Sequence, residues 1–155
     1  MNTERTLVLC KPDTVQRQLV GRVISRLEEK GLKIVGIKML RVDEDLARQQ
    51  YQEHVEKSFF SDLVSFITAS PVVAIAAEGN NAVEVVRRLM GATNPQDAAA
   101  GTIRGDFGLN FTKNMVHGSD SLGSAKRELA LFFLKRSCRI IPLSLRHGCR
   151  LTSCS

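Results

Sequence analysis

The sequence predicts a single α/β domain in which helices pack on a four-stranded sheet. Two observations lead to this fold class. The chain has 155 residues, of which 43% are hydrophobic and 25% are charged, and this suits one domain with its own core. Along the chain, apolar or alternating segments typical of strands are interleaved with segments of helical period.

Four segments are expected to form strands, because they are continuously apolar or alternate and are rich in β-branched residues. They are residues 6–10, 33–42, 71–77 and 115–117. The first should end at Pro12, because proline fixes its own φ and has no backbone N–H to donate.

Five segments are expected to form helices, most of them with apolar residues at helical spacing. They are residues 20–30, 45–55, 60–68, 82–90 and 121–133. Gly31 and Gly91 are natural stops for two of these helices. Residues 92–114 are polar and contain Pro95 and three glycines, so we expect a long loop there. Loops of this length in a compact domain are usually functional or disordered.

The positive charge of the chain is concentrated near its C-terminus. The net charge is +6, but residues 135–155 contain five basic residues and no acidic residue. Without them, 17 basic and 16 acidic residues remain, which is a net charge of +1. A nearly neutral body lacks the basic stripe of a nucleic-acid-binding domain, so we expect no specific nucleic-acid partner.

Cysteine usage and the N-terminus indicate the cellular compartment. Three of the four cysteines lie in residues 135–155, and there is no Cys-x-x-Cys pair, so we interpret them as free thiols in a reducing compartment. No apolar run approaches the roughly 20 residues of a membrane helix. The first residues lack the basic start and apolar stretch of a signal peptide. A cytoplasmic protein without a membrane partner is expected.

The most promising reactive residue is His117. It stands at the end of an expected strand and is followed by Gly118, Ser119 and Asp120, whose small or polar side chains leave the ring open on one side. A neutral imidazole is a nucleophile near neutral pH. Glu128 lies eleven residues on, about three turns along the next helix, where its carboxylate could orient the ring or hold Ser119.

Several side chains could bind phosphate. Three are cations near expected strand ends, helices or loops: Lys11, Arg87 and Arg104. Two are neutral donors: Thr93 and Asn114. Arginine offers a fork for phosphate oxygens and lysine a point charge. The alternative for each cation is a solvated surface charge, because spacing in one sequence does not show that the residues converge. Neither a P-loop nor a Gly-x-Gly-x-x-Gly fingerprint is present.

Aromatic residues are scarce, which draws attention to Tyr51, Phe59 and Phe60. Phe60 has the helical period of its segment and should pack in the core. Phe59 does not have this period, and one of these aromatic residues could stack on a base.

Taken together, these motifs closely resemble those of the nucleoside diphosphate kinase family. The resemblance runs from about residue 4 to residue 134, and its last two segments are highly specific. The principal matching segments are Lys11-Pro12-Asp13, Tyr51 with Glu53-His54, Phe59-Phe60, Gly91-Ala92-Thr93-Asn94-Pro95, Gly101-Thr102-Ile103-Arg104-Gly105-Asp106-Phe107 and Asn114-Met115-Val116-His117-Gly118-Ser119-Asp120-Ser121.

The resemblance implies a ferredoxin-like α/β sandwich and a ping-pong phosphotransferase. A nucleoside triphosphate, typically ATP, would give its γ-phosphate to His117, and a nucleoside diphosphate would then accept it. A Mg²⁺ ion would be coordinated mainly by the nucleotide phosphates, and Asp120 could bind it through water. Family members assemble as homo-oligomers, so a hexamer is expected, with a tetramer as the alternative.

The resemblance also implies individual roles. Lys11, Arg87, Thr93, Arg104 and Asn114 resemble the phosphate and ribose contacts of the family. Phe59 resembles the residue that stacks on the base. Lys11 and Tyr51 resemble residues near the transferring phosphate, and Ser119 and Glu128 resemble the pair that supports the histidine.

The resemblance stops at Lys135. We therefore divide the chain into a kinase domain, residues 1–134, and an atypical basic, cysteine-containing tail, residues 135–155. We hypothesise that the tail is the product of a reading-frame change near Leu134, because another frame can encode an acidic, family-like segment. The alternatives to a kinase are a nucleic-acid-binding protein or a scaffold that uses this tail. The charge distribution argues against the first, and the intact motifs argue against the second.

Overall fold

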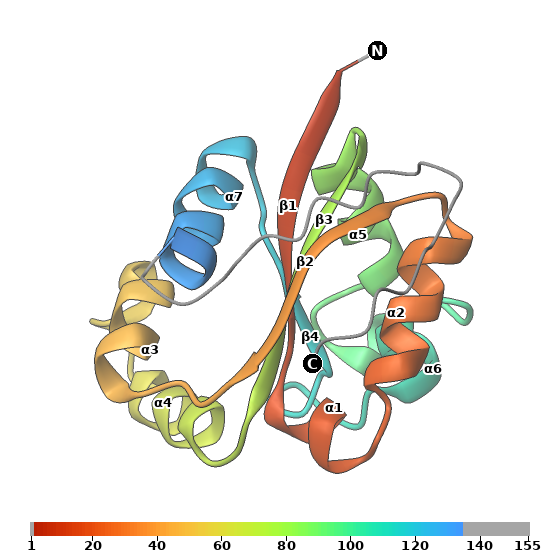
Figure 1. Ribbon diagram of the computed structural model, residues 1–155. Helices are drawn as coiled ribbons and strands as arrows, with labels where there is room; N and C mark the ends of the chain where they lie inside the picture. Colours follow the sequence, from red (N-terminus) through yellow and green to blue (C-terminus); the bar gives the residue numbers. More distant parts are fainter. Residues whose placement is uncertain (1, 135–155) are drawn as a thin grey trace, which may run out of the picture.

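The computed structural model describes residues 2–134, which form an antiparallel four-stranded sheet with helices on both faces (Figure 1). The strands are β1 (Thr3–Cys10), β2 (Lys33–Leu40), β3 (Val72–Asn80) and β4 (Val116–Gly118). Their order across the sheet is β2-β3-β1-β4, and every pairing is antiparallel. The predicted ferredoxin-like fold with a four-stranded antiparallel sheet is confirmed. The predictions about residues 135–155, including the reading-frame hypothesis, concern a segment outside the described residues.

The helices of the described residues divide into regular helices and short turns. The regular helices are α1 (Pro12–Gln16), α2 (Val20–Glu29), α3 (Glu44–Gln50), α4 (Phe60–Thr68), α5 (Ala82–Met90), α6 (Ile103–Phe107) and α7 (Leu122–Leu129). The turns are the 3₁₀-helices η1 (Gln52–His54) and η2 (Pro95–Asp97) and a π-helical turn, η3 (Ala130–Leu134).

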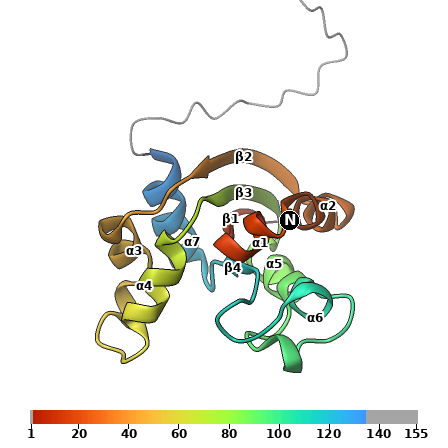
Figure 2. The same ribbon diagram turned by 90° about the horizontal axis from the view of Figure 1, so that it is seen from below.

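The sheet separates two hydrophobic cores. Helices α3, α4 and α7 lie on one side, and α2, α5 and α6 lie on the other, as both views show (Figures 1 and 2). Successive side chains of a strand point to opposite faces. Accordingly, Leu7 and Leu9 of β1 belong to the core under α3, α4 and α7, whereas Val8 and Cys10 belong to the core under α2 and α5. All four of these residues are fully buried.

Three expectations about local structure needed correction. The first strand does end before Pro12, but the chain then forms α1, because proline at the first helical position is preorganised for a helix. The helix expected over residues 45–55 ends at Gln50, and a separate 3₁₀ turn follows Tyr51. The loop expected over residues 92–114 contains η2 and α6.

The two helices inside that loop begin with side-chain caps. The Asn94 side chain accepts a hydrogen bond from the Gln96 backbone N–H, and the Thr102 side chain accepts one from the Gly105 backbone N–H. Each helix is about one turn long, which is too short to show a helical period in the sequence. The composition therefore indicated a loop, although Asn94 and Thr102 are residue types that favour the N-cap position of a helix.

Among the described helices, none combines the length and apolar character needed to cross a membrane.

Candidate active site

The site is organised by the short pairing of β4 with β1. His117 lies opposite Leu9 in this pairing, so its side chain is on the face that α3 and α7 cover. The ladder continues where the Lys11 backbone N–H donates to the Met115 carbonyl over 2.9 Å. Lys11 and His117 therefore come from neighbouring strand ends, although more than 100 residues separate them in the sequence.

A buried carboxylate holds the ring of His117. The Nε2 atom lies 3.2 Å from each carboxylate oxygen of Glu128. The Ser119 hydroxyl donates to Glu128 Oε2 over 2.5 Å, and Glu128 is only 3% exposed. Burial raises the pKa of Glu128, but the hydrogen bonds from His117 and Ser119 and the charge of Arg127 outweigh it, so the pKa lies below its usual value. Glu128 is therefore a carboxylate that accepts a hydrogen bond from Nε2–H of His117.

Tyr51 closes the other side of the ring. Its ring meets that of His117 edge-on, with 6.0 Å between the centroids. Burial, and secondarily the negative charge of Glu128, raises the pKa of Tyr51 well above its usual value, so the phenol keeps its proton. The hydroxyl is buried and has no hydrogen-bond partner among the described residues. It is available as a donor to a bound ligand.

Gln50, which the sequence did not suggest, also reaches this cluster. Its amide nitrogen lies 3.0 Å from His117 Nε2 and 3.0 Å from Glu128 Oε1. Gln50 ends α3, immediately before Tyr51, and is 4% exposed. Its position next to Tyr51 was the one available signal, and nothing in its residue type pointed to the histidine.

Two buried cations lie beside the strand ends. Lys11 and Arg104 are 8% and 5% exposed, and Lys11 Nζ donates to Asn114 Oδ1 over 2.8 Å. Burial, with the charge of Arg104, lowers the pKa of Lys11 to about 8. Burial, with the charge of Arg87, lowers the pKa of Arg104 to about 10. The charged forms of Lys11 and Arg104 are therefore disfavoured in the free chain. An anion bound between them would stabilise both charges.

Arg104 has a second, structural task. Its guanidinium donates to the carbonyl oxygens of Asn114, Gly91 and Val116 over 3.1, 3.1 and 2.8 Å. It therefore ties the end of α5 and the chain before β4 to α6. Gly91 has φ of +82°, and a Cβ atom there would lie 2.4 Å from Thr102 Oγ1, so this approach requires glycine.

The remaining predicted residues lie around these two groups. The Asn114 amide donates to the Thr93 carbonyl over 3.0 Å, so Thr93 joins the cluster through its backbone, while its side chain is exposed. Arg87 is exposed on α5, and its charge contributes to the lowered pKa of Arg104. The pKa of Asp120 is lowered mainly by hydrogen bonds from Ser124 and Ser121, and less strongly by the charge of Arg87.

Phe59 lies outside these two groups of contacts, and Lys57 Nζ is 5.8 Å from the centroid of its ring. It is 45% exposed, whereas Phe60 is buried in the core, as predicted. Ring contacts connect Phe59 to His54 and His54 to Tyr51, with centroid distances of 5.6 and 6.5 Å. The structure thus places Phe59 at the outer end of a row of rings that leads to His117.

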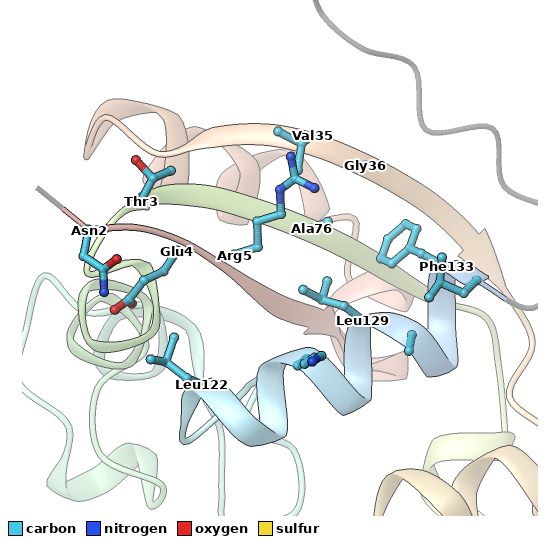
Figure 3. Close-up of a pocket in the computed structure, with 13 residues that line it drawn as sticks. Asn2, Thr3, Glu4, Arg5, Val35, Gly36, Ala76, Leu122, Leu129 and Phe133 are labelled. Atoms are coloured by element: carbon cyan, nitrogen blue, oxygen red, sulfur yellow. The ribbon is translucent and has the colours of Figure 1, made fainter.

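A cavity of the described residues lies apart from this site. It has a volume of about 480 Å³ and lies between α7 with η3 and the face of the sheet formed by β1, β3 and β2 (Figure 3). Val35, Leu129 and Phe133 line it, and no predicted site residue does. Within residues 2–134, no group of three or more His, Cys, Asp or Glu side chains is placed to hold a metal ion.

An α/β sandwich that holds a histidine against a buried carboxylate, beside crowded cations, has the features of an enzyme that handles phosphate groups. Comparison with known proteins agrees. The family model described as "Nucleoside diphosphate kinase" matches residues 4–138. The chain belongs to the nucleoside diphosphate kinase family, and it is therefore a nucleotide-binding kinase, as the motifs predicted.

Relatives match along most of their length. A nucleoside diphosphate kinase of Archaeoglobus fulgidus is 62% identical over 130 residues, which cover 84% of this chain and 86% of the relative. One of Thermobifida fusca is 60% identical, with 84% and 96% covered. A structure of a halophilic nucleoside diphosphate kinase from Halobacterium salinarum in complex with CDP has a TM-score of 0.83 and 56% identity, and the match covers 85% of this chain and 88% of that one.

Proposed function

We propose that the chain transfers the γ-phosphate of a nucleoside triphosphate to a nucleoside diphosphate in two steps, with His117 carrying the phosphate between them. The observation that carries the proposal is the different surroundings of the two ring nitrogens. Nε2 faces Glu128, whereas Nδ1 has no hydrogen-bond partner among residues 2–134, and the side chain is 23% exposed. Nδ1 is the nitrogen that a nucleotide can reach.

The chemistry follows from this tautomer. With its proton on Nε2, the neutral ring has a lone pair on Nδ1, which attacks the γ-phosphorus. The Nδ1–P bond forms, the bond from the phosphorus to the bridging oxygen breaks, and the nucleoside diphosphate leaves with that bond's electron pair. The ring becomes positively charged, and the Glu128 carboxylate stabilises it through Nε2–H. A second nucleoside diphosphate reverses these steps.

The cation cluster supplies charge neutralisation, which phosphoryl transfer needs more than acid–base catalysis. We assign Lys11, Arg87 and Arg104 to the phosphates, because their mutual repulsion favours an anion between them. Asn114 and Thr93 are assigned to polar contacts with phosphate or ribose. We assign the unpaired Tyr51 hydroxyl as a donor to the transferring phosphate, because its ring contacts that of His117.

Phe59 is assigned to the base. Its exposed ring lies at the far end of the row of rings from His117, and stacking tolerates every base. The relative from Halobacterium salinarum was solved with CDP, which supports a nucleotide site in this chain as well. Broad tolerance of the base is therefore expected.

We also propose that Mg²⁺ accompanies the nucleotide. No acidic cluster of the described residues can hold the ion alone, so its ligands would be mainly phosphate oxygens. Asp120 is exposed, and hydrogen bonds from Ser124 and Ser121 lower its pKa, so a carboxylate is available to bind through water. When bound, the ion would neutralise charge on the phosphates.

A homo-oligomer, a hexamer or alternatively a tetramer, is proposed from the family resemblance. Ile37 and Met39 on the edge strand β2 are 50% and 62% exposed, and Phe111 is 63% exposed, which supports burial against other copies. Light scattering after size-exclusion chromatography tests it. A cytoplasmic location stays a prediction, tested by cell fractionation.

The transfer itself is tested by incubation with ATP labelled in the γ-phosphate. The wild-type chain should become a phosphoprotein that is labile in acid and stable in base, and His117→Ala should abolish the label. His147→Ala, outside the described residues, is the matched histidine control and should keep it. Equal labelling of His117→Ala and the wild type would refute the assignment.

A further inference from the structure

We propose that Gln50 is a positioning residue for phosphate transfer: it holds the Glu128 carboxylate in place against His117 Nε2. The inference rests on the proposed function of His117 and concerns a residue that the motifs of the sequence do not include. Three distances carry it. The Gln50 amide nitrogen lies 3.0 Å from both His117 Nε2 and Glu128 Oε1, and the last two atoms lie 3.2 Å apart.

These three atoms form a nearly equilateral triangle, so the two possible acceptors subtend an angle close to 60° at the Gln50 nitrogen. The two N–H bonds of a planar amide diverge by about 120°, so they cannot both point at these acceptors. One acceptor must take the hydrogen bond. Glu128 Oε1 is charged, and bonds to charged acceptors are roughly twice as strong as neutral ones. Gln50 therefore donates to Glu128.

The orientation of the amide follows from the same contact. Exchanging its oxygen and nitrogen would bring two acceptor oxygens, Gln50 Oε1 and Glu128 Oε1, to 3.0 Å from each other. In the favoured orientation, both Gln50 and Nε2–H of His117 donate to the carboxylate. This arrangement selects the tautomer with a free lone pair on Nδ1, which is the one that attacks phosphorus.

Each carboxylate oxygen of Glu128 thereby accepts a hydrogen bond from a different side chain. Ser119 binds Oε2 over 2.5 Å and Gln50 binds Oε1 over 3.0 Å. Without Gln50, the nearest remaining charged group to Oε1 is Arg127, at 3.6 Å, with a side chain that is 33% exposed. We expect the carboxylate then to turn toward Arg127 and solvent, which weakens its hydrogen bond to Nε2.

The Gln50 side chain has one feature that is unfavourable for the stability of the fold in this position. Its Oε1 atom is buried and has no hydrogen-bond partner among the described residues. A buried unpaired oxygen is destabilising, and an apolar side chain of similar shape would avoid it. Gln50→Met should therefore fold about as stably as the wild type, because removal of the unpaired oxygen offsets the lost hydrogen bond to Glu128, although it should transfer phosphate more slowly. A residue with a purely structural role would show the opposite pattern.

The test measures the rate constant of His117 phosphorylation by rapid quenching with labelled ATP. Gln50→Met should lower this rate constant about tenfold, because the charged hydrogen bond between Glu128 and Nε2 is weakened in part. The dissociation constant of ADP should not change to match. Gln50→Asn, whose amide is one methylene too short, should lose a similar factor. Gln52→Met, an exposed neighbour in η1, is the matched control and should keep the wild-type rate.

Two further readouts separate positioning from a general disturbance. In a Glu128→Gln background, Gln50→Met should have no further effect on the rate, because Gln50 acts through the carboxylate. Nitrogen-15 NMR of the His117 ring should show a smaller fraction of the Nε2–H tautomer in Gln50→Met than in the wild type.

The inference is overturned if Gln50→Met keeps the wild-type rate, if its defect persists undiminished in the Glu128→Gln background, or if the Nε2–H fraction rises. Failure of the proposed function is a distinguishable result, since the wild-type chain would then acquire no label on His117. The NMR comparison needs no phosphate transfer and still tests whether Gln50 sets the tautomer.

Discussion

The buried charge of Lys11 makes a prediction about stability that can be worked out from its pKa. Burial and the nearby Arg104 lower this pKa from 10.5 to about 8. Below pH 8, the folded chain must keep a disfavoured charge, which destabilises it by about 3 kcal/mol relative to an ordinary lysine. Lys11→Gln removes the charge and can keep part of the hydrogen bonding to Asn114. We expect the unfolding free energy to rise by about 1 to 3 kcal/mol at pH 7.

The dependence on pH gives the sharper test. Because the folded pKa lies below the unfolded value, the unfolded chain binds more protons between about pH 8 and pH 10.5, and the stability of the wild type rises with pH in that window. The penalty is fully present below pH 8. Urea unfolding followed by circular dichroism should therefore show that the advantage of Lys11→Gln is constant up to pH 8 and disappears toward pH 10.5. A difference that does not change with pH, or that grows, would refute the reasoning.

Bound nucleotide should offset the same penalty. The proposed binding of phosphate beside Lys11 would stabilise its charged form, so ADP should raise the stability of the wild type more than that of Lys11→Gln. Calorimetric titration should show wild-type affinity for ADP falling above pH 8, as Lys11 loses its proton, with a smaller fall in the variant. Parallel pH profiles would place Lys11 outside the nucleotide site.

Three other predictions concern the site. Phe59→Ala should weaken ADP binding by about 1 to 3 kcal/mol in calorimetry with little change in the phosphorylation rate at saturating ATP, and an unchanged affinity would exclude base stacking. Ser119→Ala removes a hydrogen bond that lowers the pKa of Glu128, so the loss of activity on acidification should begin at a higher pH than in the wild type; a profile displaced the other way would contradict this. Asn114→Ala leaves Lys11 Nζ without its amide partner and should reduce the unfolding free energy by about 1 to 3 kcal/mol in urea, whereas an unchanged value would show that the contact is dispensable.

The sequence predicted the strands and the longer helices of the fold. All four strands were expected, because an apolar run such as residues 71–77 identifies a buried strand without tertiary information. The missed elements are short. Helix α1 has five residues, and its one local signal, Pro12 at its start, also signals the end of the strand before it. The break at Tyr51 follows from packing against the core, which no local pattern records.

The site could be predicted only in part, for a physical reason. Motifs suggested which residues belong to the candidate site, but the contacts join positions such as Lys11 and Asn114 that lie 103 residues apart in the sequence. The three carbonyl contacts of Arg104 and the backbone role of Thr93 depend on how the chain turns before β4. Gln50 lies outside the residue types that phosphate chemistry needs, so only the fold brings it to notice.

The most direct test of the central claim is to locate the phosphate in the chain after reaction with ATP. Mass spectrometry under alkaline conditions, combined with phosphorus and nitrogen NMR, should place a single phosphate on Nδ1 of His117. Adding a nucleoside diphosphate should remove it and form the corresponding triphosphate. A phosphate on Nε2 or on another residue, or one that persists after the diphosphate is added, would contradict the account.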